Sequence, residues 1–382
     1  MIGGFALPAN RAKETLFTQI PRFAHVELLR RSDSIIVRRI RALIVDGSAV
    51  LGPALVEALA SDPQIEVMPV AGDPVAAARL IGGQVPDVVV LHAGTQRTDG
   101  LAFLQEAMAQ RLIPVIVCAT LAGEGADGAL KALQFGAVGV VALPTRGVER
   151  FLRKSGGQLC RAVKAAATAK PQPGRLVEPW LAAAAGPDAA RPPDARRVVL
   201  VGASTGGPEA LGVALAALPA ESPGLLIVQH MPEPLTGAFA RHLDGQCAIA
   251  VKEAEDGDPV LPGRALLAPG NRHLLLRVSA GRYYAEVRKG PPVCRHRPSV
   301  DVLFRSGARC AGENAVGVLL TGMGKDGARG LLELKQAGAA TIAQDESTSA
   351  VFGMPHAAIQ LGAAAQVQPI EKIAPAILEA CR

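Results

Sequence analysis

The stretch VVLVGASTGGP, residues 198–208, decides the fold of the C-terminal half of this chain. Its first four residues are apolar and mostly β-branched, which predicts a buried parallel strand ending at Gly202. Ser204 and Thr205 then lie in a turn, and residues 208–218 predict a helix that begins with proline, where a missing N–H costs nothing. A serine on such a turn lies beside the free N–H groups of a helix N-terminus, which favour an oxyanion. The turn therefore fits a nucleophile.

The same turn has two other interpretations. Glycine-rich turns after a strand also bind phosphates, and many are purely structural. Residues 202–207 lack the G-x-G-x-x-G spacing of a dinucleotide loop, and no Walker lysine follows them. The turn alone leaves nucleophile, phosphate loop and structural turn open, so the rest of the chain has to decide between them.

Composition narrows the class of protein. A chain of 382 residues with 49% apolar residues predicts two or three domains, each with its own core. The net charge of +6 comes without a long basic run and with only 3% aromatics, so we expect no nucleic-acid partner. We expect no membrane insertion, since no apolar run reaches ~18 residues, and no signal peptide. The cysteines form no C-x-x-C pair and fit a reducing cytoplasm: Cys118, Cys160, Cys247, Cys294, Cys310 and Cys381.

Strand and helix patterns alternate through the first half. We expect strands at 41–46, 67–70, 87–92, 114–119 and 138–142, and helices at 49–60, 74–84, 100–110, 126–135 and 147–165. Strict alternation predicts a doubly wound parallel sheet. A second α/β domain begins at Val198, with strands that include 198–201, 224–229, 264–268, 283–288, 315–320 and 339–344.

These patterns divide the chain into four segments. Residues 1–38 lack a clear period and predict a poorly ordered extension. A receiver-like doubly wound domain occupies 39–150, and a linker helix followed by an Ala/Pro-rich linker occupies 151–195. Residues 196–382 form the C-terminal, Rossmann-like α/β domain.

Two further strand ends carry polar side chains in the C-terminal domain. His230 ends the predicted strand at 224–229, and Asp326 lies in a Gly-rich turn after the strand at 315–320. With Ser204, they form the polar set of an acyl-transfer enzyme, in which His takes the Ser proton and Asp fixes the His tautomer. Met323 is a candidate donor of a backbone N–H to the oxyanion. A histidine at a strand end is more often a structural hydrogen-bonding group, and an Asp in a turn is usually turn chemistry.

Six motifs in order identify a family. They are GASTGGPEAL (202–211), QHMP (229–232), LAPGNRHLLL (267–276), RHRPSVDVLF (295–304), LLTGMGKDGARGL (319–331) and QDESTSAVFGMPHAAI (344–359). Together they closely resemble the chemotaxis protein-glutamate methylesterase (CheB) family over essentially all of 196–382.

The resemblance implies roles for individual residues. The catalytic residues are Ser204, His230 and Asp326, the oxyanion position is Met323, and Thr205 neighbours the nucleophile. Arg295, His296 and Arg297 belong to a loop near the active site. The chain departs from the family at Cys294, where an Asn often precedes RHRP, and we expect this to tune the loop.

The resemblance also implies the reaction and its partners. It is hydrolysis of γ-methyl glutamyl esters on methyl-accepting chemotaxis receptors, with deamidation of selected glutamines by the same chemistry. No metal or organic cofactor is required. A chemotaxis histidine kinase or another signalling protein is the further partner that a receiver-like domain implies, and the cytoplasm is the implied location.

The first domain resembles the family's phospho-receiver but has lost its chemistry. Asp46 keeps one of two acids that hold Mg²⁺, and Gly47 replaces the other. His92 stands where the phospho-accepting Asp belongs, Ala119 at the hydroxyl position and Leu143 at the Lys position. Without the acceptor carboxylate no acyl phosphate forms. The hypothesis is a pseudo-receiver that controls the esterase through protein contacts, as a permanent cap, as a displaceable one, or as a stabilising domain only.

Two other functions compete with the esterase. One is a non-catalytic regulator or scaffold of a chemosensory-like pathway, against which the intact Ser204, His230 and Asp326 count. The other is a nucleotide-binding protein that uses the 202–207 turn, which the missing Walker lysine makes less favoured.

Overall fold

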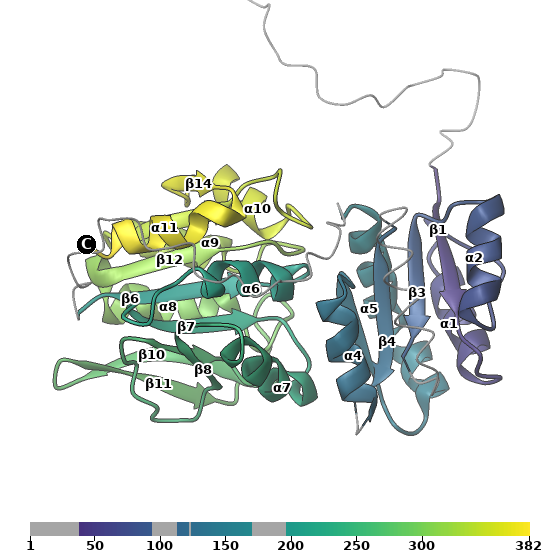
Figure 1. The fold of residues 1–382 in the computed structure, drawn as a ribbon, viewed down its shortest axis with the longest axis horizontal. Helices are drawn as coiled ribbons and strands as arrows, with labels where there is room; N and C mark the ends of the chain where they lie inside the picture. Colours follow the sequence, from purple (N-terminus) through teal and green to yellow (C-terminus); the bar gives the residue numbers. More distant parts are fainter. Residues whose placement is uncertain (1–37, 94–112, 122–123, 170–195) are drawn as a thin grey trace, which may run out of the picture. The chain divides into compact units, whose positions relative to one another are not determined.

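A computed structural model describes residues 38–93, 113–121, 124–169 and 196–382. Residues Arg38–Arg382 form one compact unit that contains two large parallel sheets (Figure 1). The doubly wound α/β class expected for both halves is confirmed. The predicted helix at 100–110 and the predicted disorder of the N-terminal extension up to residue 37 lie outside the described residues.

The first sheet has five parallel strands in the order β2-β1-β3-β4-β5, which is the flavodoxin-like order. Its strands are β1 (Ile40–Val45), β2 (Ile65–Val67), β3 (Val88–His92), β4 (Val115–Thr120) and β5 (Gly139–Leu143). Its described helices are α1 (Leu51–Ala60), α2 (Pro74–Gly83), α4 (Glu124–Gln134) and α5 (Val148–Ala167). Helices α1 and α5 cover one face, and α2 and α4 cover the other.

One strand of this sheet differs from its prediction. The pattern predicted residues 67–70, whereas β2 covers Ile65–Val67. The Met68 N–H still donates to the carbonyl oxygen of Ala42, but the next bond runs from Ala71 to the carbonyl oxygen of Ile44, three residues on instead of two, so the regular pairing is broken around Pro69. Pairing with β1 resumes only at the single bridge between Val45 and Ala71.

Helix α5 belongs to the core of the first sheet. Leu152, Leu159, Cys160 and Val163 are buried on its inner face, and α5 packs against α1. The Cys160 thiol also donates to the carbonyl oxygen of Ala58 in α1 at 3.3 Å. We therefore propose that the first domain extends to the end of α5 and that the boundary at residue 150 lies too early.

The second sheet has seven parallel strands in the order β14-β13-β12-β6-β7-β9-β8. They are β6 (Val198–Ala203), β7 (Gly224–Gln229), β8 (Ala250–Glu253), β9 (Arg264–Leu267), β12 (Ala315–Leu319), β13 (Ala340–Gln344) and β14 (Gln366–Gln368). The sequence did not predict the short edge strands β8 and β14. The first strand also runs past Gly202, because Ala203 still pairs with Gln229 of β7.

A separate antiparallel hairpin joins β10 (His273–Ser279) to β11 (Arg282–Arg288). Residues 283–288 are a strand, as predicted, but they pair with β10 and not with the main sheet. Ala280 and Gly281 connect the two strands with φ angles of 48° and 74°, which suits a tight hairpin turn. The base of the hairpin lies at His273 and Arg288, and its tip lies at Ser279 and Arg282.

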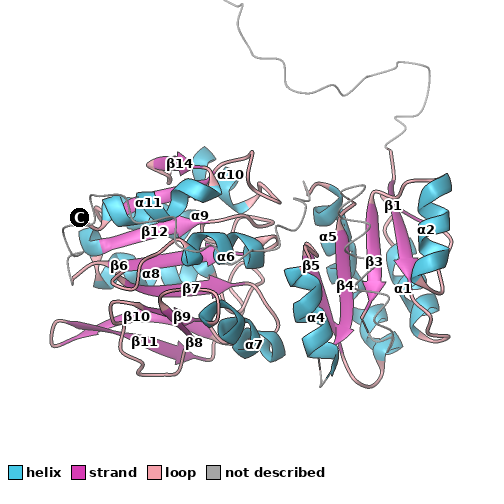
Figure 2. Cartoon of the chain, viewed as in Figure 1, coloured by secondary structure: helices cyan, strands magenta, loops and turns pink. Residues whose placement is uncertain are grey.

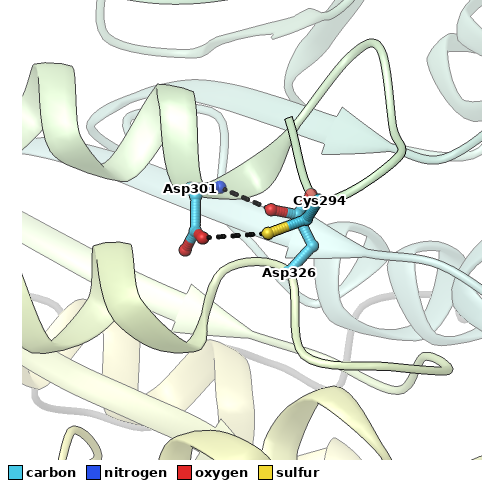
Figure 3. Close-up of side chains that lie close together, drawn as sticks. All are labelled: Cys294, Asp301 and Asp326. Atoms are coloured by element: carbon cyan, nitrogen blue, oxygen red, sulfur yellow. Dashed lines mark hydrogen bonds between the residues drawn. The ribbon is translucent and has the colours of Figure 1, made fainter. Parts of the chain in front are cut away.

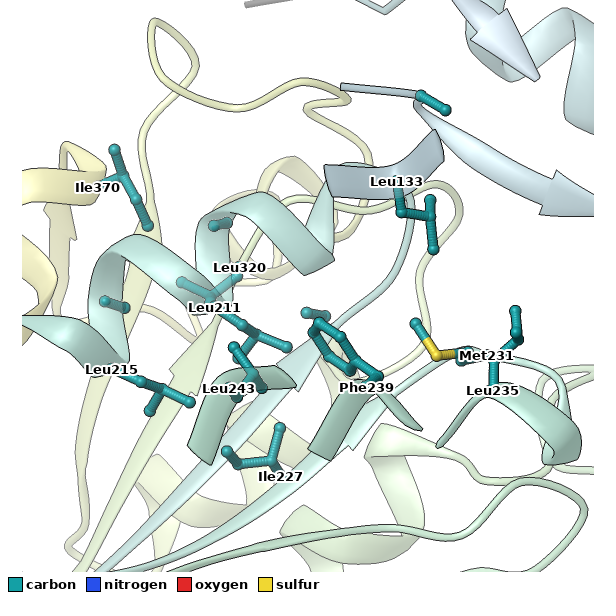
Figure 4. Close-up of a cluster of buried hydrophobic side chains, with 14 of the residues drawn as sticks. Leu133, Leu211, Leu215, Ile227, Met231, Leu235, Phe239, Leu243, Leu320 and Ile370 are labelled. Carbon is teal, nitrogen blue, oxygen red and sulfur yellow. The ribbon is translucent and has the colours of Figure 1, made fainter. Parts of the chain in front are cut away.

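Helices cover both faces of the seven-stranded sheet (Figure 2). One face carries α6 (Gly207–Ala216), α7 (Glu233–Asp244) and α11 (Ile370–Ala380), and the other carries α8 (Val300–Cys310), α9 (Ala328–Gln336) and α10 (Met354–Gln360). Figure 4 shows the core under α6 and α7, where Leu211, Leu215, Ile227, Phe239 and Leu243 are buried together. Each Å² of apolar surface buried in this way stabilises the fold by about 25 cal/mol. The packed core therefore holds the strand ends in fixed positions.

The strand order changes direction beside β6. The chain goes from β6 to β7 on one side and later returns to β12 on the other. In open α/β sheets, ligands bind outside the carboxyl ends of the strands at such a switch point. Among the residues that the structure describes, no helix is both long and apolar enough to cross a membrane.

Candidate active site

Ser204 follows β6 directly and is held by its backbone. Its N–H donates to the carbonyl oxygen of Thr321 at 3.0 Å. Its own carbonyl oxygen accepts from Nε2 of Gln229 at 2.8 Å and from the N–H of Gly207 at 2.8 Å. Gly206 before α6 has a φ of 75°, the left-handed conformation that favours glycine. The turn predicted from the sequence is present, and Ser204 is 9% exposed in it.

A second glycine lets the chain approach Ser204 closely. A Cβ added to Gly322 would lie 2.7 Å from the Cβ of Ser204 and 2.3 Å from the sulfur of Met354. The turn after β12 therefore packs directly on the serine because this position has no side chain. Met323 is the next residue of that turn and is half-buried. Thr205 accepts a hydrogen bond from Oγ1 of Thr321 at its carbonyl oxygen, at 3.0 Å.

His230 follows β7 as Ser204 follows β6. Ala203 and Gln229 are paired residues of these strands, so Ser204 and His230 are the next residues at one edge of the sheet. The N–H of His230 donates to the carbonyl oxygen of Ala203 at 3.1 Å. Neighbouring strands lie about 4.8 Å apart, so the backbones of Ser204 and His230 lie next to each other at this edge.

The two ring nitrogens of His230 have different surroundings. Nε2 lies 2.8 Å from Oδ2 of Asp326, and the His230 side chain is 7% exposed. Nδ1 is buried and has no hydrogen-bond partner among the described residues. A neutral ring that donates from Nε2 to the carboxylate leaves a lone pair on Nδ1, which is the acceptor that a serine hydroxyl requires.

Asp326 is surrounded by donors. Its Oδ1 accepts from Oγ of Ser299 at 2.8 Å and from the N–H groups of Asp301 and Gly327 at 3.1 Å. Its Oδ2 accepts from the N–H of Val300 at 2.8 Å as well as from His230. The carboxylate thus lies at the N-terminus of α8, where the helix dipole favours a negative charge. The sequence did not predict these partners or this helix, although Ser299 is a residue type that often precedes a helix N-terminus.

The charge of Asp326 is stabilised by these bonds. Burial by itself would raise its pKa, but the hydrogen bond from His230, the charge of that ring and the backbone N–H groups of Val300 and Asp301 outweigh burial and lower it. The carboxylate therefore stays ionised at neutral pH. An ionised carboxylate can hold the Nε2 proton in place and stabilise the imidazolium that forms during proton transfer.

A second imidazole lies on His230. The rings of His230 and His296 stack with centroids 3.8 Å apart and planes 2° from parallel. Burial, together with the neighbouring His230, lowers the pKa of His296 to about 4. His296 is therefore neutral at pH 7 and packs on the His230 ring without adding a positive charge.

The loop before α8 carries strained residues. Cys294 and Arg295 have φ angles of 49° and 70°, which non-glycine residues rarely adopt. Burial, together with the nearby Asp326 and Asp301, raises the pKa of the Cys294 thiol to about 11. The protonated thiol donates to Oδ2 of Asp301 at 3.5 Å (Figure 3). Cys294, the departure from the family pattern, thus fixes this loop to α8.

Cys294, Asp301 and Asp326 have potential metal ligands within 4.8 Å of one another. Both oxygens of Asp326 already accept hydrogen bonds, and Oδ1 of Asp301 accepts from the N–H of Gly330 at 2.7 Å. The Cys294 sulfur keeps its proton at neutral pH. These donors and acceptors satisfy one another, so we assign no metal site to the cluster.

The other two residues of the predicted loop, Arg295 and Arg297, have different surroundings from His296. Arg295 is exposed, while Arg297 donates to the side-chain oxygen of Asn271 and, at 2.5 Å, to the carbonyl oxygen of Gly290. Only His296 of the three contacts His230. Arg297 instead joins the loop to the segment before β10.

The receiver-like site contains a histidine–carboxylate pair. Nδ1 of His92 lies 2.8 Å from Oδ1 of Asp46, whose side chain is fully buried. The other oxygen of Asp46 is buried without a partner among the described residues. Gly47 follows at the end of β1 and contributes no carboxylate. Ala119 is the penultimate residue of β4 and Leu143 ends β5; both are buried apolar side chains, so neither supplies a polar group.

A comparison with known proteins identifies the family. A family model described as CheB methylesterase matches residues 199–377. The chain is 60% identical over 353 residues to the protein-glutamate methylesterase/protein-glutamine glutaminase 5 of Anaeromyxobacter dehalogenans, covering 90% of this chain and 98% of that protein. The chain belongs to the CheB methylesterase family. The resemblance seen in the six sequence motifs is thereby confirmed.

Other similar proteins span both halves of the chain. Protein-glutamate methylesterase/protein-glutamine glutaminase 3 of Geobacter metallireducens is 52% identical over 354 residues, covering 90% of this chain and 100% of that protein. The solved CheB methylesterase catalytic domain of Thermotoga maritima is 39% identical and covers 48% of this chain and 97% of its own, with a TM-score of 0.47. The response regulator domain of Thermotoga maritima CheB is 28% identical and covers 35% of this chain and 100% of its own, with a TM-score of 0.32.

Proposed function

We propose that this protein hydrolyses γ-methyl esters of glutamate on methyl-accepting chemotaxis receptors and deamidates selected receptor glutamines. The observation that carries the proposal is the pair of ring nitrogens in His230. One nitrogen is bound to Asp326 and the other is buried without a described partner at the edge of the sheet where Ser204 lies. The names of the close relatives support the same substrate class.

The proposed reaction proceeds in two steps. Nδ1 of His230 takes the proton of Ser204 as its Oγ attacks the ester carbonyl, and Asp326 stabilises the imidazolium. The N–H groups at Met323 and Thr205 are the proposed donors to the oxyanion. His230 then gives the proton to the departing methoxide, which leaves as methanol. Water opens the glutamyl-serine ester by the same proton transfers in the second step, so no metal or organic cofactor takes part.

The test compares methanol release from membranes that carry methylated receptor. We expect Ser204→Ala to remain folded and to lose a factor on the order of 10⁶ in turnover, as in other triad enzymes. Ser279→Ala, at the exposed tip of the β10–β11 hairpin, is the matched control and retains turnover. Wild-type release by the Ser204 variant would contradict the assignment.

The non-catalytic alternative predicts a different result with a reactive probe. A fluorophosphonate should label Ser204 in the wild-type protein if His230 activates it, and should leave Ser204→Ala unlabelled. A scaffold protein would show no labelling of Ser204 at all. Stabilisation against heat by nucleotides would instead favour the phosphate-loop interpretation of the 202–207 turn.

We further propose that the receiver-like domain acts without phosphorylation. The His92 ring takes up one oxygen of Asp46, Gly47 supplies no second acid, and no acceptor carboxylate ends β3. Incubation with acetyl phosphate and Mg²⁺ should leave both the intact mass and the esterase rate unchanged. A phosphorylated species or a clear rise in rate would refute this, and the partner would then be sought among histidine kinases.

A further inference from the structure

A polar hollow lies beside the histidine stack. It has a volume of ≈ 400 Å³ and is lined by Glu233, Asn271, Arg272, Lys289 and Arg297. Three of these five side chains are cationic and one is anionic, so the lining carries a net positive charge. The segments that supply them are the start of α7, the loop before β10, the residue that follows β11 and the loop before α8.

The hollow is close to the reacting residues by two chain connections. Glu233 is three residues beyond His230, and three residues span at most about 10 Å. Arg297 is the neighbour of His296, whose ring stacks on His230 at 3.8 Å. Two of the residues that line the hollow, Glu233 and Arg297, are therefore held close to His230, so the hollow opens within reach of a substrate segment that is bound at the histidine.

Two of the charged groups are fixed in place. The guanidinium of Arg297 donates from Nε to Oδ1 of Asn271 at 3.0 Å and from Nη1 to the carbonyl oxygen of Gly290 at 2.5 Å. Asn271 in turn donates from Nδ2 to Oε2 of Glu233 at 3.3 Å. Asn271 thus contacts both Glu233 and Arg297. Its backbone has a φ of 59°, in the left-handed region.

The other two cations have no such partners. Among the described residues, neither Arg272 nor Lys289 forms an ion pair or a side-chain hydrogen bond, in contrast to the neighbouring Arg288, which pairs with Glu286. Arg272 is half-buried and Lys289 is exposed. Unpaired cations that line a hollow beside fixed hydrogen-bonding groups match a carboxylate ligand in charge.

We propose that the ester-bearing segment of the receptor is a helix with further acidic side chains, and that this hollow, the basic hollow, binds one of its carboxylates one or two helical turns away from the ester. Side chains three, four or seven positions apart lie on one face of a helix, about 5 to 11 Å apart along its axis. A helix whose ester reaches Ser204 then presents its next carboxylate to Arg272 and Lys289. This inference rests on the proposed function and specifies how its substrate is recognised.

The charge pattern favours a helix over a lipid surface. A membrane-binding face needs many basic residues spread over a plane, whereas the basic hollow confines two unpaired cations to one small concave site that also contains Glu233.

Long-range attraction between the hollow and an acidic helix is screened by salt, with a Debye length of about 30 Å at 0.01 M and about 3 Å at 1 M.

The test reverses charges at the basic hollow. We expect Arg272→Glu and Lys289→Glu each to raise KM for methylated receptor about fivefold at low salt, and by less than about twofold near 1 M salt, because the effect is electrostatic. Arg282→Glu is the matched control, since Arg282 is an exposed arginine at the far end of the same hairpin and forms no ion pair within the described part of the chain. It should leave KM unchanged. Melting temperatures establish that each variant is folded.

A complementary substrate change sharpens the test. A receptor in which the acidic residues one and two turns from the ester are replaced by lysine should be a poor substrate for the wild-type protein and a better one for Lys289→Glu. Equal KM values for Lys289→Glu and Arg282→Glu would overturn the basic hollow while leaving the esterase intact. Loss of binding to receptor-free anionic vesicles in Lys289→Glu would also overturn it in favour of a lipid site. A wild-type protein that releases no methanol would instead refute the proposed function.

Discussion

His296 lies face to face on His230, with ring centroids 3.8 Å apart and planes 2° from parallel. The outer ring is neutral near pH 7, because burial and the adjacent His230 lower its pKa to about 4. A neutral His296 ring in this position fixes the orientation of His230. Because His296 carries no charge, a proton taken up by His230 gives the pair a single positive charge. Its protonation would put two like charges in contact, which the folded state resists.

This stack predicts a loss of stability in mild acid. The unfolded chain protonates His296 near pH 6.5, whereas the folded chain does so only near pH 4. Between these values the unfolded state binds more protons, so stability is complete above pH 6.5 and falls as the pH drops towards 4. The loss should be on the order of 3 kcal/mol.

The matched variant is His296→Phe, which keeps a flat ring on His230 and removes the titration. Urea unfolding at a series of pH values above 4 should show a flatter profile for this variant than for the wild-type protein. The measurements stop at pH 4 because Asp326 also destabilises the folded state in stronger acid. Its pKa is lowered by folding, so its contribution to stability is lost only below about pH 3.8. Parallel profiles for the two proteins would contradict the role given to His296.

A second prediction concerns the donors to Asp326. Ser299→Ala removes the buried hydroxyl that donates to Oδ1 at 2.8 Å, while three backbone N–H groups remain. We expect a loss of about 1–2 kcal/mol in stability and a roughly tenfold lower kcat, because the carboxylate is less firmly oriented. Ser299→Thr keeps the hydroxyl and should recover most of the kcat, which a purely structural role for the residue would not require.

Asp326→Asn tests the same carboxylate more severely. The amide cannot hold the Nε2 proton of His230 as a carboxylate does, so we expect kcat to fall by a factor on the order of 10⁴. Labelling of Ser204 by a fluorophosphonate should slow in parallel. Unchanged labelling would show that Asp326 does not act through His230.

A third prediction uses two glycines. Gly322→Ala would put a Cβ 2.7 Å from the Cβ of Ser204 and 2.3 Å from the sulfur of Met354, so the turn or the serine must move. We expect a fall in kcat of about a hundredfold, because small displacements of reacting groups have effects of that size. Gly212→Ala on α6 is the control: an added Cβ meets nothing within 4 Å there, and we expect a gain of about 0.5–1 kcal/mol with full activity.

A fourth prediction concerns the pair in the receiver-like domain. His92→Leu leaves the buried carboxylate of Asp46 without its partner and should reduce stability by about 3 kcal/mol. The double variant Asp46→Leu/His92→Leu replaces the pair with apolar groups and should recover most of that loss. Urea unfolding of the full chain measures both. Equal losses in the single and double variants would show that the pair itself is not what His92 contributes.

The sequence predicted most of the fold because its strands carry long apolar runs. The strand at 224–229 was placed without error, and those at β3, β4 and β5 were placed to within a residue. The prediction from sequence failed where the apolar pattern of a strand was short or interrupted. Strand β2 stops before Pro69, and the edge strands β8 and β14 have only four and three residues. Their pairing depends on neighbours far away in the chain.

Local order along the chain was enough to show which residues stand at the ends of β6, β7 and β12, and to which family the chain belongs. The folded arrangement was needed to show which nitrogen of His230 meets Asp326, that Ser299 and the start of α8 hold that carboxylate, and that His296 stacks on the histidine. It also brought Glu233, Arg272, Lys289 and Arg297 around one hollow. These relations join segments that are tens of residues apart, and their geometry is set by how the helices and loops pack around the sheet.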